Sequence, residues 1–130
     1  MNDHGIFSLN LDGNILTVEG CGPWNMEAMK ISFANAELML EIRGKVKWGI
    51  IAIIHGDPVH TPDAAELLVE QIIEDKKHGR IATAFILSDS TAPYFGKLHF
   101  SELCAKADET CGFFDNVTDA DIWMKTKLAE

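Results

Sequence analysis

The stretch that decides the fold is WGIIAII at residues 48–54, a continuous run of apolar and mostly β-branched residues. Such a run is typical of a central strand covered on both faces, as in a parallel sheet. The segment IATAFIL at residues 81–87 has the same character and predicts a second buried strand. The two runs together favour an α/β domain.

The segment between these two runs has the start and stop signals of a helix. Thr61 stands at the expected N-cap, Pro62 at the first helical position, and Asp63 favours the positive helix end. Gly79 is expected to end the helix. The stripe expected to be buried consists of Ala65, Leu68, Ile72 and Ile73.

The chain before residue 48 predicts a hairpin followed by one helix. Residues 7–11 and 14–18 alternate between apolar and polar, and Asp12-Gly13 between them is a strong turn signal. Residues 20–25 (GCGPWN) are expected to break the second strand, with Asn25 capping the next helix. Gly44 is the expected stop. Helical spacing is carried by Met26, Met29, Phe33, Ala36 and Leu40.

The chain after residue 87 adds two helices and a strand. Ser88-Asp-Ser-Thr91 is expected to open a helix at roughly 93–106, and residues 111–114 predict a short strand. Thr118-Asp-Ala-Asp121 resembles a capping box that starts the last helix, which carries Trp123. The predicted order is therefore β-β-α-β-α-β-α-β-α in one domain spanning 1–130, with a mixed, mostly parallel sheet and an opening antiparallel hairpin.

Composition narrows the classes of partner and compartment. The net charge is −9 and the basic residues are scattered, so a nucleic-acid partner is not expected. The start of the chain lacks the pattern of a secretory signal, and the longest apolar run is far shorter than the roughly 20 residues that span a bilayer. Cys21, Cys104 and Cys111 have no CxxC spacing, which favours reduced thiols in the cytoplasm.

Ligands of open parallel sheets gather beyond the carboxyl ends of the strands. Three predicted loops fall at that edge, at residues 20–25, 55–63 and 88–94. They carry polar and amphipathic aromatic residues, which suit binding sites, but no complete catalytic set. The candidate ligand- or partner-binding residues are Trp24, Asn25, His60, Thr61, Ser90 and Tyr94.

Several stretches have a second interpretation. His55, Asp57 and His60 are metal-ligand types within one segment, but their spacing matches no established metal signature, and a solvated strand-to-helix loop explains them better. Met26, Met29 and Met39 are expected to pack in the core, with a flexible pocket wall as the alternative. Ser88, Ser90 and Thr91 are expected to cap a helix, with phosphate binding on free backbone N–H groups as the alternative. No catalytic residue and no cofactor is predicted.

The order of elements resembles the STAS-like, SpoIIAA-like superfamily, the fold of the anti-sigma-factor antagonists. The resemblance covers nearly the whole chain and rests on the hairpin, the WGIIAII strand, the helix at Thr61 and the ending Phe113-Phe114-Asp115 to Ala120-Asp-Ile-Trp123. It implies a regulatory module whose second helix begins with a phosphorylated serine. The matching stretch here, residues 61–65, departs from that pattern because Thr61 is its only hydroxyl.

These observations predict a non-enzymatic STAS-like module that binds a protein partner or a small apolar or anionic ligand at the edge after the parallel strands. Relatives that resemble lipid-carrier domains imply the first alternative, a peripheral membrane or lipid-binding protein. The second alternative is a small metal-dependent hydrolase that uses His55, Asp57 and His60. A second copy of the chain is left open as a partner.

Overall fold

The computed structural model describes residues 5–32 and 36–130. Its strands form one five-stranded sheet in chain order, β1-β2-β3-β4-β5. The strands are β1 (Gly5–Asp12), β2 (Ile15–Trp24), β3 (Trp48–His60), β4 (Arg80–Ile86) and β5 (Thr110–Phe114). The helices are α1 (Met26–Ser32), α2 (Ala36–Arg43), α3 (Pro62–Lys76), α4 (Pro93–Lys106) and α5 (Val117–Ala129).

The sheet is mixed, as predicted. β1 and β2 pair antiparallel through a tight turn in which Gly13 has φ +61°, and the three remaining pairs are parallel. Glycine suits that turn because it adopts positive φ without a steric cost. The α/β class, the opening antiparallel pair and the mostly parallel sheet are therefore confirmed.

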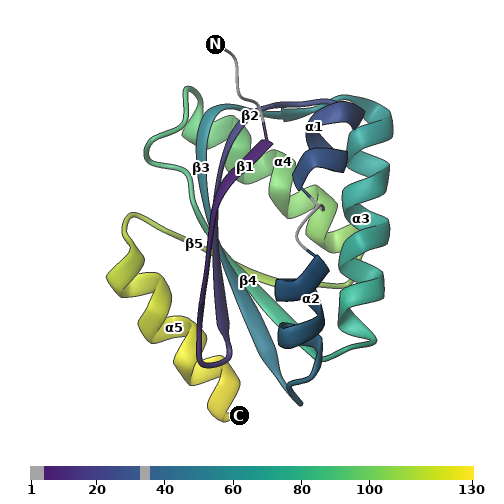
Figure 1. The fold of residues 1–130 in the computed structure, drawn as a ribbon. Coiled ribbons are helices and arrows are strands. Elements are labelled where there is room, and N and C mark those ends of the chain that lie inside the picture. Colours follow the sequence, from purple (N-terminus) through teal and green to yellow (C-terminus); the bar gives the residue numbers. More distant parts are fainter. Residues whose placement is uncertain (1–4, 33–35) are drawn as a thin grey trace.

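The helices lie in two unequal layers (Figure 1). Each parallel crossover moves to the next strand in the same direction, and right-handed crossovers then place their helices on one face. The helices α1 to α4 cover that face, whereas α5 packs alone on the opposite face against β3, β4 and β5. Alternate residues of the central strands consequently enter two separate apolar cores.

Strands β2 and β3 are longer than the sequence predicts. Residues 20–24 and 55–60, expected to be loops, continue the two strands and remain paired, with Cys21 opposite His55 and Trp24 opposite His60. The ladder continues past Pro23 with a shift in register between Gly22 and Trp24. Each segment contains turn-forming residues, and the pairing between the two segments overrides that local preference.

The predicted first helix is divided into α1 and α2. Phe33, expected on its buried stripe, lies outside the described residues, as does the side chain of Met39. Leu40 was expected to be buried and is instead 74% exposed. On α3 the predicted stripe is also partly wrong, because Ile73 is 41% exposed whereas Ala64 is fully buried.

Two helix starts differ from the prediction. Helix α5 is capped by Asn116, whose side chain accepts a hydrogen bond from the Asp119 backbone N–H, and not by Thr118. Helix α4 begins after Ala92 without a side-chain cap, so Ser88, Ser90 and Thr91 do not cap it.

Within the described residues, none of the helices combines the length and apolar character needed to cross a bilayer.

Candidate functional site

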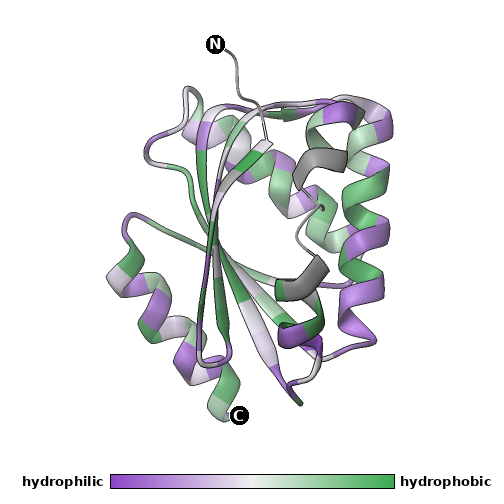
Figure 2. Ribbon diagram, viewed as in Figure 1, coloured by the Kyte–Doolittle hydropathy of each residue, from purple (hydrophilic) through white to green (hydrophobic). Residues whose placement is uncertain are grey.

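A cavity of about 460 Å³ lies between the sheet and the layer formed by α1 to α4. Apolar side chains dominate its walls, and Figure 2 shows the matching pattern on α3, where hydrophobic and hydrophilic residues alternate along the helix. The apolar lining includes Leu16, Val18, Met29, Ile54, Leu68 and Phe85. This space is of the size that natural ligand pockets occupy, roughly 300–1,000 Å³.

Small residues on two neighbouring strands leave room at the floor of the cavity. Gly20 on β2 and Ala52 on β3 both line the space and bear little or no side chain. A Cβ atom at Gly20 would lie 2.4 Å from Cη2 of Trp24, so glycine allows that indole ring to lie against the strand. The ring of Trp24, which is only 5% exposed, lines the cavity at this end.

Stacked rings form the wall of the cavity beside Trp24. The His60 ring stacks on Trp24 with a centroid distance of 5.7 Å, and His60 Nδ1 lies 2.9 Å from His99 Nε2. Burial, followed by the nearby His99, lowers the pKa of His60 to about 3. Burial also lowers the pKa of His99. Both imidazoles are therefore neutral at neutral pH, and this wall is aromatic and uncharged.

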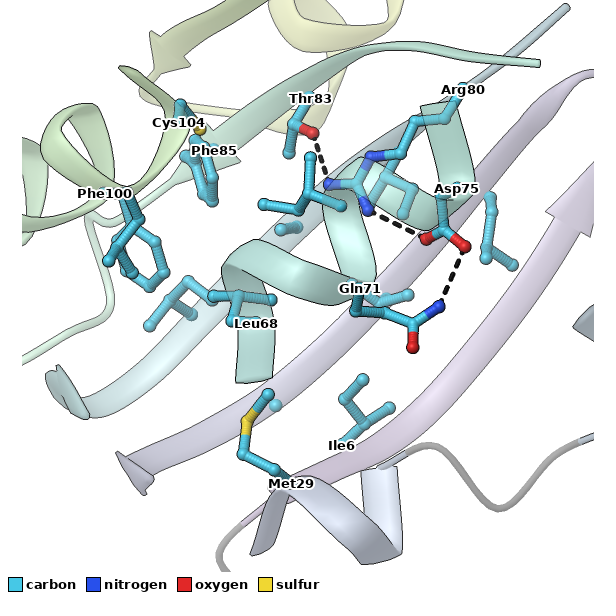
Figure 3. A pocket seen from close by; sticks show the side chains of 18 of the residues that line it. Ile6, Met29, Leu68, Gln71, Asp75, Arg80, Thr83, Phe85, Phe100 and Cys104 are labelled. Atoms are coloured by element: carbon cyan, nitrogen blue, oxygen red, sulfur yellow. Dashed lines mark hydrogen bonds and ion pairs between the residues drawn. The ribbon is translucent and has the colours of Figure 1, made fainter. Parts of the chain in front are cut away.

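The opposite end of the cavity is built around a buried ion-pair network (Figure 3). Arg80 donates from Nη1 to Asp75 Oδ2 at 3.1 Å, from Nε to Glu109 Oε2 at 2.8 Å and from Nη2 to Thr83 Oγ1 at 2.7 Å. Thr83 in turn donates to Glu109 Oε2 at 2.6 Å. The side chains of Arg80, Asp75 and Glu109 are 6%, 2% and 0% exposed. Buried charges persist in proteins when they are paired in this way.

Two further side chains join this network from α2 and α3. Arg43 Nη2 and Gln71 Nε2 both donate to Asp75 Oδ1, at 2.7 Å and 2.9 Å. Arg43 Nε is buried and has no hydrogen-bond partner among the described residues. Gln71, Asp75, Arg80 and Arg43 all line the cavity. One end of the cavity is thus polar and the other aromatic.

The three segments predicted to meet at the carboxyl edge do meet. Gly22 pairs with Gly56, and Gly56 forms an isolated bridge with Ser90. The backbone N–H of Thr91 also donates to the Gly56 carbonyl at 2.9 Å. The topological argument therefore placed these segments side by side correctly, although two of them are strands.

Of the six predicted site residues, only Trp24 and His60 line the cavity. Asn25 caps α1 as expected, accepting a hydrogen bond from the Ala28 backbone N–H at 2.9 Å. Ser90 donates to the Leu87 carbonyl, and Tyr94 is 77% exposed. The side chains of Asn25 and Ser90 therefore form hydrogen bonds to nearby backbone groups and do not face the cavity.

Thr61 occupies the N-cap position of α3, as predicted, but its hydroxyl does not cap the helix. The hydroxyl donates to Asp63 Oδ1 at 2.5 Å, and that same oxygen accepts the Ala64 N–H at 2.9 Å. The carboxylate of Asp63 therefore satisfies the helix end in place of Thr61. The hydrogen bond from Thr61 is the main cause that lowers the pKa of Asp63.

The residues of the metal alternative have separate partners. His55 Nε2 lies 2.6 Å from Glu19 Oε2, Asp57 accepts from Thr91, and His60 contacts His99. Among the described residues no group of three or more His, Cys, Asp or Glu side chains is arranged to hold a metal ion. The structure thus brings together no ligand set at this segment.

The polar end of the cavity was missed by the sequence analysis. Asp75 and Arg80 lie on either side of Gly79, next to a buried strand, and Arg80 is the first residue of β4. A charged residue beside a buried run was a signal available in the sequence. Its partner Glu109 is 29 residues further along the chain, so no local pattern connects the two.

A scan against protein-family models found no match, and searches of curated proteins and of solved structures also found none.

Proposed function

We propose that this chain is a non-enzymatic binding protein that holds a small, mainly apolar molecule between its sheet and the layer of α1 to α4. The observation that carries the proposal is the cavity of about 460 Å³. Protein interiors are packed as densely as organic crystals and contain few voids larger than a water molecule. An apolar space of this size is therefore typical of a ligand pocket and not of ordinary core packing.

The resemblance to the STAS-like superfamily forms part of the same proposal. A sheet in chain order, an antiparallel opening pair and four helices on one face support it. That resemblance also implies a protein partner. We place the small ligand first because Trp24 and His60, two of the three rings of the predicted edge that were expected to bind, line the cavity, whereas the third, Tyr94, does not.

The proposal is tested with N-phenylnaphthylamine, a neutral dye whose fluorescence rises in apolar pockets. Native mass spectrometry first identifies any molecule that copurifies with the protein. We expect saturable binding of the dye by the wild-type chain. Val18→Phe, which adds a ring on the cavity side of β2, should reduce dye affinity by about tenfold or more, because the dye and the new ring compete for one space.

The matched control is Thr17→Phe, one residue away on the same strand. Adjacent strand residues point to opposite faces, so this ring is added on the side of the sheet away from the cavity. Circular dichroism establishes that both variants are folded. Equal dye affinity in the wild type and in folded Val18→Phe, or no binding of dye to ligand-free wild type, would exclude the cavity as the binding site.

A further inference from the structure

The two ends of the cavity differ in polarity, and this difference indicates which kind of molecule binds there. The inference rests on the proposed function. One end is closed by the rings of Trp24 and His60, both uncharged at neutral pH. The other end presents Gln71, Asp75 and Arg80, with the Gln71 amide nitrogen turned to Asp75 (Figure 3). A molecule with one apolar and one polar end matches both walls.

The mouth of the cavity lies at the polar end, beside α2. Leu40 and Arg43 both line the cavity, yet Leu40 is 74% exposed and the Arg43 side chain is 27% exposed. Residues three apart lie on the same side of a helix, so these two side chains form one rim. A polar group held at this rim keeps part of its hydration, which lowers the cost of binding a charge.

The charge at this rim favours an anion. Three cationic side chains, those of Arg43, Lys76 and Arg80, pair with two carboxylates, those of Asp75 and Glu109. These five side chains therefore carry one positive charge in excess, and the further carboxylate that interacts with Arg43, that of Glu74, is itself paired with Lys77. Arg43 Nε is in addition a buried donor without a hydrogen-bond partner in the described part of the chain. Leaving such a donor unpaired is costly, and a charged acceptor oxygen would satisfy it best.

We infer that the ligand is an amphipathic monocarboxylate of the fatty-acid class. Its carboxylate accepts from Arg43 Nε at the rim, and its chain lies along the floor formed by β2 and β3 toward Trp24. A volume of about 460 Å³ holds about 15 groups the size of a water molecule, at roughly 30 Å³ each. A methylene group is of similar size, so a medium-length chain such as that of laurate fits.

The experiment compares three probes of equal chain length on ligand-free protein by isothermal titration calorimetry: laurate, lauryl alcohol and laurylamine. The expected order of affinity is laurate first and laurylamine last. A hydrogen bond to a charged group is worth enough to make laurate bind about tenfold or more tightly than the alcohol. Octanoate and palmitate then report how well the chain length matches the cavity.

Arg43→Met removes the charge and the donor while keeping a long side chain. We expect this variant to lose the preference for laurate over lauryl alcohol, because the affinity for laurate falls much more than the affinity for the alcohol. Lys45→Met is the control, because Lys45 is a nearby cation that does not line the cavity. This control should retain the preference for laurate.

The outcomes separate the two levels of the proposal. Equal binding of laurate and lauryl alcohol, or an undiminished preference for laurate in folded Arg43→Met, overturns the carboxylate assignment and leaves the apolar cavity in place. Failure of all three probes together with N-phenylnaphthylamine overturns the proposed function itself. Preference for laurylamine would mean that the carboxylates of the network, and not Arg43, select the ligand.

Discussion

At the scale of single residues, the two faces of the sheet differ in how they are packed. Ala52 on β3 faces the cavity, whereas Ala84 on β4 is buried in the second core with Ala120 and Met124 of α5. Both are alanines in buried strands, and nothing in the local sequence distinguishes them. Only the neighbours across the sheet determine whether a larger side chain would find room.

The first prediction compares Ala52→Leu with Ala84→Leu. The added methyl groups of Ala52→Leu enter the cavity, so we expect the free energy of unfolding to be unchanged or raised by about 1 kcal/mol. Ala84→Leu overpacks a filled core and should lower it by about 1–3 kcal/mol. Urea denaturation followed by circular dichroism measures both. Equal destabilisation by the two substitutions would contradict the presence of an open cavity.

At the scale of elements, helix starts depend on which side chain reaches the first backbone N–H groups. Asn116 fills this role for α5, although Thr118 fits the sequence pattern of a capping box. The Asn116 side chain also donates from Nδ2 to Asp119 Oδ2 at 3.2 Å. The helix therefore starts at Val117, one residue before the predicted cap, because Asn116 supplies the acceptor for the first turn.

The second prediction concerns this cap. Asn116→Ala should lower the free energy of unfolding by about 1 kcal/mol, because it removes the acceptor for the Asp119 N–H. Thr118→Ala, the matched control inside the first turn, should change it by less than about 0.5 kcal/mol. Chemical denaturation distinguishes the two. A larger effect at Thr118 than at Asn116 would restore the capping-box interpretation.

At the scale of the whole molecule, stability depends on pH through the partly buried pair His60 and His99. The folded-state pKa of His60 lies at about 3, below its ordinary value of 6.5, so the unfolded chain binds a proton more readily than the folded one. The stability due to neutral His60 is complete above about pH 6.5 and is lost as the pH falls toward 3. The lowered pKa of His99 acts in the same direction.

The third prediction follows from the lowered pKa of His60 in the folded state. His60→Phe keeps a ring against Trp24 but cannot titrate, so the loss of stability between pH 6.5 and pH 4 should be smaller than in the wild type, by up to about 1.4 kcal/mol per pH unit. Parallel pH profiles for the wild type and His60→Phe would refute the lowered pKa of His60.

The sequence by itself determined the α/β class, the hairpin, the order of the strands, the order of the elements after residue 48 and the meeting of three segments at the carboxyl edge. These features follow from local patterns: the apolar runs at residues 48–54 and 81–87, the turn at Gly13 and the proline at the start of α3. Such patterns act over a few neighbouring residues, so they can be read along the chain.

The cavity and its polar end were decided only by the tertiary structure. Arg80 meets Glu109 and Arg43 meets Asp75 across separations of 29 and 32 residues, and the space between sheet and helices depends on how far α1 to α4 stand from the floor. The extension of β2 and β3 to Trp24 and His60 likewise depends on pairing between distant segments. Packing is a property of neighbours in space, and a periodic pattern along the chain cannot specify whether the volume between two apolar faces is filled.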